Sequence, residues 1–230
     1  GFDLYQGFFF SKPQHFTDRK LEASKASRIR ILKTINKPNL EIEDFVHLVQ
    51  NDPSITYRLL RLLNSSFFGF NSEIKSVRHA VTLLGLKQIR HWLRMVVLSD
   101  LVDDSKTPEL YLLALNRGKF LEELAVRSQI RNIDPETMFL FGMLSLIHTM
   151  LDMPFEEINA QLPLSSDLKD GYIDPDSRFA VYLDLVRSIE RGEADEIRSL
   201  CRRTGIDPGE AAQASINSTG WTNALAQEIL

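Results

Sequence analysis

Hydrophobic residues recur at helix spacing along most of the chain. Apolar positions three or four residues apart predict amphipathic helices. Three well-separated runs have this spacing: Ile55, Leu59, Leu62 and Leu63; Leu86, Ile89, Leu93, Val96, Val97 and Leu101; and Phe179, Leu183, Val186 and Ile189. After residue 13 no convincing alternation of apolar and polar residues, typical of a strand, occurs. We therefore predict an all-α domain over residues 38–230.

Residues that favour helix starts and stops lie between these runs. A capping side chain followed by proline suits the first turn of a helix. The chain has five such pairs: Asp52-Pro53, Thr107-Pro108, Asp134-Pro135, Asp174-Pro175 and Asp207-Pro208. Glycines that favour helix ends are Gly69, Gly85 and Gly205. Residues 64–76 and 162–175 are expected to be loops.

The first 37 residues differ from the rest. Residues 1–13, GFDLYQGFFFSKP, form an aromatic run that predicts a strand, and residues 14–37 form a basic stretch that predicts a linker helix. Because the chain begins at Gly1 and not at methionine, we expect it to be a fragment of a longer protein.

The most apolar segment is residues 138–151, MFLFGMLSLIHTML. It is too short to span a bilayer, which needs about 20 residues. We predict a buried central helix around which the other helices pack. Since no export segment is present either, we predict a cytoplasmic protein without a membrane partner.

Composition narrows the classes of function. The 230 residues include 27 Lys and Arg against 31 Asp and Glu, a formal net charge of −4, and one cysteine. A single cysteine, Cys201, excludes a disulfide-stapled fold. The slightly acidic balance disfavours nucleic acid as a partner. Composition leaves the oligomeric state open.

The motifs of common enzyme classes are missing from the sequence. No glycine-rich phosphate loop, zinc-protease motif or nucleophile elbow occurs. No two of the five histidines are three or four residues apart, so no helix face presents a pair of metal ligands. The sequence predicts no catalytic residue, no bound metal and no cofactor.

An ordered set of motifs covers residues 52–92: Asp52-Pro53, Leu59-Leu60-Arg61-Leu62, Asn64-Ser65, Phe68-Gly69, His79-Ala80, Leu83-Leu84-Gly85, and the region of Arg90 and Trp92. This order resembles the HDOD domain, a helical relative of the HD phosphohydrolases. With weaker agreement toward the C-terminus, the resemblance covers most of the chain. It implies an HD-like helical bundle over residues 38–230.

The first thirteen residues resemble the closing strand of an EAL domain, the barrel that binds or hydrolyses cyclic di-GMP. The matching residues are Gly1, Asp3, Gln6-Gly7, Phe10 and Ser11-Lys12-Pro13. An EAL domain followed by an HDOD domain is a recurring bacterial arrangement. The resemblance implies that residues 1–13 end an EAL domain, that residues 14–37 form a linker, and that the upstream EAL domain is a partner in cis.

HD enzymes carry a metal-binding His-Asp doublet in a helix resembling G-L-L-H-D-I-G. The corresponding run here is GMLSLI at residues 142–147, so Ser145 and Leu146 stand in place of the doublet. Leucine cannot bind a metal, and a serine hydroxyl is a poor substitute for imidazole. His148 is favoured as a core histidine over a replacement ligand. The resemblance therefore implies that HD activity is lost.

Eight residues are candidates for an interaction or ligand surface: Arg58, Arg61, Asn64, Ser65, Phe68, His79, Arg90 and Arg94. The polar-aromatic turn among them fits either a packed helix end or an exposed recognition surface. The arginines fit either a solvated face or a contact with an acidic partner or a phosphate. The histidine fits either a structural bridge or a pH-sensitive switch.

The predicted function is a non-catalytic output module of a bacterial EAL–HDOD signalling protein. It would receive a conformational change through the linker helix and alter a contact with an unknown protein partner. Two alternatives stay open: a residual metal-dependent phosphohydrolase with a metal near Ser145 or His148, and a nucleotide-sensing module in which the four arginines hold a phosphate. The full-length protein is a candidate cyclic di-GMP phosphodiesterase if its EAL domain is intact.

Overall fold

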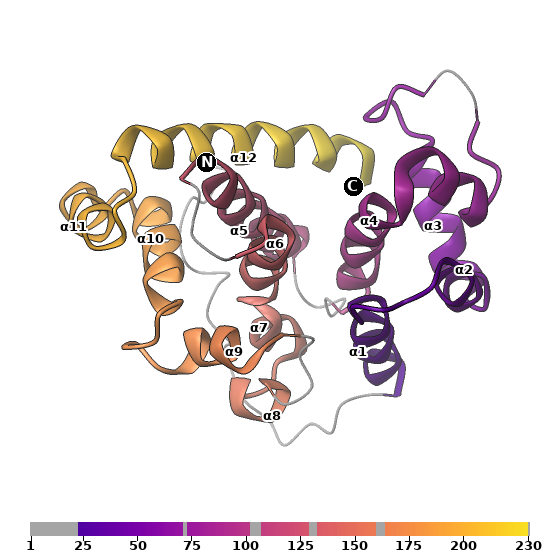
Figure 1. Ribbon diagram of the computed structural model, residues 1–230, viewed down its shortest axis with the longest axis horizontal. Coiled ribbons are helices and arrows are strands. Elements are labelled where there is room, and N and C mark those ends of the chain that lie inside the picture. The colour runs from indigo at the N-terminus through magenta and orange to yellow at the C-terminus, as the bar shows by residue number, and fades with distance from the viewer. Residues whose placement is uncertain (1–22, 71–72, 102–106, 129–132, 160–163, 230) are drawn as a thin grey trace, which may run out of the picture. The chain divides into compact units, whose positions relative to one another are not determined.

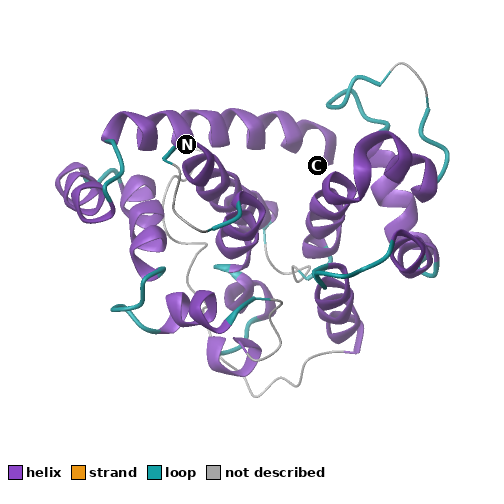
Figure 2. Ribbon diagram, in the orientation of Figure 1, coloured by secondary structure: helices purple, strands orange, loops and turns teal. Residues whose placement is uncertain are grey.

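The computed structural model describes residues 23–70, 73–101, 107–128, 133–159 and 164–229. Every regular element in these ranges is an α-helix (Figure 2). This confirms the predicted all-α class, while the strand predicted at residues 1–13 lies outside the described residues. The helices fall into two compact units, and Figure 1 labels them along the chain.

The first unit contains four helices: α1 (Ala23–Ile35), α2 (Ile42–Gln50), α3 (Pro53–Leu63) and α4 (Val77–Ser99). Each helix buries an apolar face in the core of this unit, which includes Ile29, Leu32, Ile35, Phe45, Val49, Ile55, Leu59, Leu63, Ile89, Leu93 and Val97. Helix α1 belongs to the stretch predicted as a linker, and it packs on α4 within this unit.

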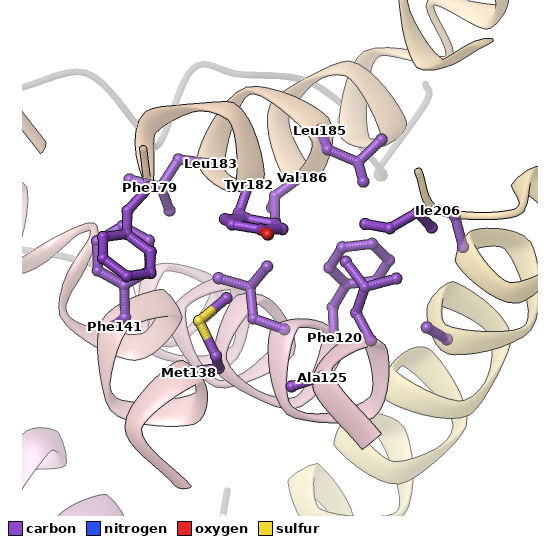
Figure 3. Packing of buried hydrophobic residues seen from close by; sticks show 14 of the residues in the cluster. Phe120, Ala125, Met138, Phe141, Phe179, Tyr182, Leu183, Leu185, Val186 and Ile206 are labelled. Atoms are coloured by element: carbon purple, nitrogen blue, oxygen red, sulfur yellow. The ribbon is translucent and has the colours of Figure 1, made fainter. Parts of the chain in front are cut away.

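The second unit contains α5 (Pro108–Arg127), α6 (Pro135–Leu144), α7 (Ile147–Leu151), α8 (Phe155–Asn159), α9 (Ser166–Ile173), α10 (Ala180–Arg191), α11 (Ala194–Thr204) and α12 (Pro208–Ile229), of which residues 223–229 group with the first unit. Figure 3 shows its core, in which side chains of α5 and α6 meet those of α10. Labelled members are Phe120, Ala125, Met138, Phe141, Phe179, Tyr182, Leu183, Leu185, Val186 and Ile206.

Helices α5 and α6 approach each other closely at two glycines. A Cβ atom at Gly142 would lie 2.5 Å from the carbonyl oxygen of Arg117, and one at Gly118 would lie 2.8 Å from that of Phe139. Any other residue would force the two backbones apart, so glycine is required for this contact.

Four of the five predicted helix starts are confirmed: α3, α5, α6 and α12 begin at the prolines after Asp52, Thr107, Asp134 and Asp207. The start predicted at Asp174-Pro175 is wrong, because α10 begins at Ala180. The Asp174 carboxylate accepts a hydrogen bond from the backbone N–H of Asp176 at 3.0 Å. It thus forms a local turn instead of a helix cap.

The predicted loops and helix ends are confirmed in part. The described residues between α3 and α4 contain no helix, as predicted, whereas the predicted loop at 162–175 contains α9. Gly205 ends α11 in the left-handed region, with φ of 73°. Gly85, with φ of 80° and ψ of 153°, has a non-helical backbone and divides α4 into two helical segments, in agreement with the predicted stop. Gly69 lies in the loop, because α3 already ends at Leu63.

The single helix predicted at residues 138–151 is wrong. The segment is buried as expected, but α6 ends at Leu144 and α7 begins at Ile147. The break falls at Ser145, whose hydroxyl accepts a hydrogen bond from Arg117 of α5. A contact with another helix therefore accompanies a break that the local apolar pattern does not reveal.

Candidate functional site

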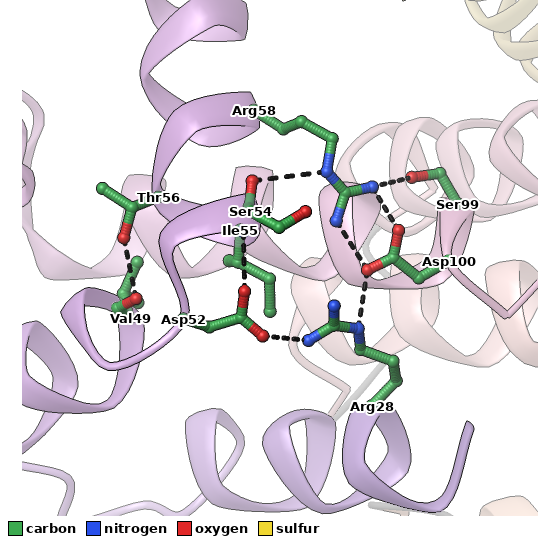
Figure 4. Close-up of polar contacts among 9 residues, drawn as sticks. All are labelled: Arg28, Val49, Asp52, Ser54, Ile55, Thr56, Arg58, Ser99 and Asp100. Carbon is green, nitrogen blue, oxygen red and sulfur yellow. Dashed lines mark hydrogen bonds and ion pairs between the residues drawn. The ribbon is translucent and has the colours of Figure 1, made fainter. Parts of the chain in front are cut away.

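Four charged side chains meet in the first unit, and we call Arg28, Asp52, Arg58 and Asp100 the charge cluster (Figure 4). Arg28 of α1 donates to the Asp52 carboxylate, and its Nε lies 2.7 Å from Oδ2 of Asp100. Arg58 of α3 donates to both oxygens of Asp100, with 2.6 Å between Nη2 and Oδ2. Two positive and two negative charges thus balance one another where three helices meet.

Helix ends place the two carboxylates. Asp52 is the N-cap of α3 and accepts a hydrogen bond from the Ile55 N–H at 3.0 Å, while Asp100 is the C-cap of α4. Burial raises the pKa of Asp52, but its hydrogen bonds from Arg28 and Ile55 lower it more, so the net direction is downward. The Asp52 carboxylate is therefore ionised at neutral pH.

Two of the four predicted arginines hold helices together. Arg58 is part of the charge cluster. Arg94 is 5% exposed, and its Nε donates to Oδ1 of Asn36 at 2.9 Å. Arg61 is exposed and Arg90 is partly buried. The proposal that these arginines contact a partner or a phosphate stays a prediction, with Arg61 the most accessible of them.

Asn64 closes the loop after α3. Its Nδ2 donates to the carbonyls of Leu60 and Ile74, each at 2.9 Å, and its Oδ1 accepts from the Ile74 N–H at 2.7 Å. The side chain of Asn64 therefore fixes both ends of this turn, which agrees with the interpretation as a packed helix end. Ser65, next along the chain, is partly buried.

The aromatic residues of this turn form a stack on α4. Phe68 stacks on Phe70 with ring centroids 5.6 Å apart, and it meets Trp92 edge to face at 4.6 Å. Phe68 is partly buried, whereas Phe70 keeps 37% of its surface exposed. Phe68 therefore serves packing, and Phe70 is the ring of this stack most open to contact.

His79 is tied to the start of α4. Its backbone N–H donates to the N-cap hydroxyl of Ser76 at 3.0 Å, and its Nδ1 accepts from the Lys75 N–H at 3.4 Å. These are contacts within one segment, and they give the imidazole a local structural role.

A buried guanidinium contacts Ser145, one of the two residues that stand in place of the HD doublet. Arg117 is 3% exposed, and its Nη1 donates to the Ser145 hydroxyl at 3.1 Å. Its Nε and Nη2 donate to the two oxygens of Glu190 on α10 at 2.7 and 2.8 Å. Such a two-pronged pair fixes both side chains in position. Leu146 is buried beside Ser145.

His148 lies near Arg117 and a second arginine, Arg187. Its Nε2 is 3.2 Å from the Thr149 hydroxyl, and its ring centroid is 6.0 Å from that of Phe155. Burial first, and then the positive charges of Arg117 and Arg187, lower the pKa of His148 from 6.5 to about 4. The imidazole is therefore neutral at pH 7.

The substitution His148→Gln is expected to flatten the dependence of stability on pH. Because the folded-state pKa lies below the ordinary value, the unfolded chain binds the proton first as pH falls from about 6.5 to 4. This contribution to stability is complete above pH 6.5 and is lost through that window. Without the His148 imidazole, the slope of the unfolding free energy against pH should fall by up to about 1.4 kcal/mol per pH unit. Urea titrations from pH 4 to 8 measure the slope, with His47→Gln on an exposed face of α2 as the matched control. An unchanged slope in His148→Gln would contradict the prediction.

Sequence reasoning missed Arg28, Asp100, Arg117 and Glu190 as site residues. The pair Arg117 and Glu190 is separated by 73 positions, and Arg58 and Asp100 by 42. No local spacing pairs residues so far apart. One clue was present, since Arg117 falls among buried apolar positions of α5, and a charged residue there needs a partner.

Two features are absent from the residues that the structure describes. The described residues contain no group of three or more His, Cys, Asp or Glu side chains placed to hold a metal ion. None of their helices has the length and apolar character needed to cross a bilayer. Cys201 is 1% exposed, and burial, followed by the charge of Asp207, raises the pKa of its thiol, which agrees with a structural role.

Two curated relatives match almost the whole chain. The "Cyclic di-GMP phosphodiesterase CdgJ" of Vibrio cholerae serotype O1 is 28% identical over 229 residues, which are 100% of this chain and 52% of that protein. The "Uncharacterized protein YuxH" of Bacillus subtilis is 30% identical over 227 residues, 98% of this chain and 54% of that protein. The chain thus spans about half the length of these relatives.

A solved structure and a protein family also match this chain. The crystal structure of a "Putative phosphohydrolase" from Shewanella amazonensis SB2B superimposes with a TM-score of 0.65 at 16% identity, and the match covers 89% of this chain and 93% of that one. This likeness confirms the predicted HD-like helical fold. The HDOD domain family matches residues 23–153, which is more than half of the chain. The chain therefore belongs to the HDOD domain family.

Proposed function

We propose that this chain is a non-catalytic output module of a cyclic di-GMP signalling protein. In this proposal an EAL domain precedes it in the full-length protein, and the module acts through contacts with a protein partner. The relative named as a cyclic di-GMP phosphodiesterase supports the signalling context, since the chain matches about half of that protein. The other half of such a protein would hold any phosphodiesterase activity.

The contact among Arg117, Glu190 and Ser145 carries the non-catalytic part of the proposal. A catalytic metal needs anionic or neutral ligands with an open position for water. Here a guanidinium contacts Ser145 and is held by both oxygens of Glu190. The Ser145 hydroxyl oxygen already accepts a hydrogen bond from this guanidinium, and no imidazole or carboxylate stands at 145 or 146.

An assay of the purified chain tests this proposal. We expect no linearisation of cyclic di-GMP above a protein-free control, with Mg²⁺ or Mn²⁺ added. The Vibrio cholerae relative serves as the active comparison under the same conditions. Metal analysis of the native chain should find no stoichiometric transition metal. Metal-dependent product formation by this chain would overturn the proposal and favour a residual phosphohydrolase.

A further inference from the structure

Helix α1 is joined to the rest of the first unit by a buried apolar line, by ion pairs and by a hydrogen bond just beyond its last turn. Ile29, Leu32 and Ile35 form its buried apolar line, at 2%, 1% and 0% exposed. Arg28 contributes the ion pairs to Asp52 and Asp100. At the other end, Asn36 accepts the hydrogen bond from Arg94.

The charge of α1 complements the two carboxylates that it contacts. Within Ala23–Ile35 the charged residues are Lys25, Arg28, Arg30 and Lys33, with no acidic residue. Helix α1 therefore carries four positive charges and places one of them between two aspartates. A helix of 13 residues is also marginal on its own in water. Its helical state depends on remaining docked.

The remaining helices keep partners for both aspartates without α1. Asp52 accepts the N-cap hydrogen bond from Ile55 in α3. Asp100 is held on both oxygens by Arg58. Departure of Arg28 would thus leave neither carboxylate without a partner, so these two aspartates avoid the large penalty of a stranded buried charge.

The cluster is also open enough for water to replace Arg28. Side chains of Arg28, Asp52, Arg58 and Asp100 keep between 18% and 30% of their surface exposed. Partly exposed ion pairs contribute modestly to stability and weaken as salt screens them. The electrostatic attachment of α1 is therefore weak and dependent on ionic strength.

We infer that α1 is a detachable helix, held by its buried apolar line and by the ion pairs of Arg28, which opens while α2, α3 and α4 stay folded. This inference rests on the proposed function, because it names the element by which the output module would be switched. A change in the preceding part of the protein would release or retain α1. The surface that α1 covers would be exposed only in the released state.

Hydrogen exchange of the whole chain, read by mass spectrometry, tests this inference. Arg28→Gln is compared with Arg30→Gln, which removes the same charge from an exposed position of the same helix. We expect amides 23–35 to exchange about fivefold faster in Arg28→Gln, with α3 and α4 unchanged. Arg30→Gln should match the wild type. In the wild type, raising salt from 0.05 to 0.5 M (roughly 14 Å to 4 Å in screening length) should accelerate α1 alone.

Several results would overturn the inference. One is unchanged exchange of α1 in Arg28→Gln. Another is faster exchange of α1, α3 and α4 together, or loss of the folded state, because either would make α1 an integral part of the core. Equal acceleration by both substitutions would make the effect one of net charge only. The exchange experiment contains no cyclic di-GMP, so a positive phosphodiesterase assay would refute the proposed function and leave these measurements valid.

Discussion

Replacement of Glu190 by methionine is expected to lower the free energy of unfolding of the second unit by about 3–5 kcal/mol. Arg117 is 3% exposed and would lose both of its hydrogen bonds to the carboxylate. Its bond to the Ser145 hydroxyl would remain, but a neutral hydroxyl cannot offset the desolvation of a full charge. Arg117→Met should cost less, because the Glu190 side chain is 16% exposed and can be hydrated.

The measurement is urea unfolding, monitored through the fluorescence of Trp221 in a variant that also carries Trp92→Phe. The chain has two tryptophans, one in each unit, so this probe reports the second unit. Glu193→Met is the matched control, because Glu193 is 42% exposed in a 3.7 Å contact with Arg191; we expect a change within about 0.5 kcal/mol. The double variant Arg117→Met/Glu190→Met should recover most of the loss. A loss below about 1 kcal/mol in Glu190→Met would contradict the buried-pair interpretation.

Replacement of Gly142 by alanine is expected to destabilise the second unit by about 3 kcal/mol, the upper end of the usual cost of overpacking. The new Cβ would lie 2.5 Å from the Arg117 carbonyl oxygen, 2.7 Å from its carbonyl carbon and 2.8 Å from the Gly118 nitrogen. All three are backbone atoms, so no side-chain rotation relieves the clash. Helices α5 and α6 would have to separate, which would loosen the core that they share.

Gly220→Ala in α12 is the matched control for this substitution. Gly220 also lies inside a helix, but no atom is within 4 Å of its Cβ position. Alanine there should stabilise the protein by about 0.5–1 kcal/mol, because it lowers the entropy of the unfolded chain and favours the helix. In both thermal and urea unfolding, the midpoint should fall in Gly142→Ala and rise in Gly220→Ala. A neutral or stabilising Gly142→Ala would be incompatible with the close approach of α5 and α6.

The sequence predicts which residues belong to the candidate surface better than it predicts what each of them contacts. Asn64 was identified as part of a turn, and the structure gives it three hydrogen bonds that close that turn. Arg58 was identified on a helical face, yet its partner Asp100 lies 42 positions away. Helical spacing shows which side chains share a face of one helix. It contains no information on which other helix that face meets.

The sequence by itself determined the all-α class, four helix starts and the HDOD resemblance. Apolar periodicity, N-caps and prolines act within a few residues, so their effect can be recognised locally. The tertiary structure decided the break at Ser145, the pairing of Arg117 with Glu190 and the attachment of α1 through Arg28. Each of these depends on the free energy of bringing distant side chains out of water together. That energy is set by which helices pack against each other, and no local pattern along the chain specifies it.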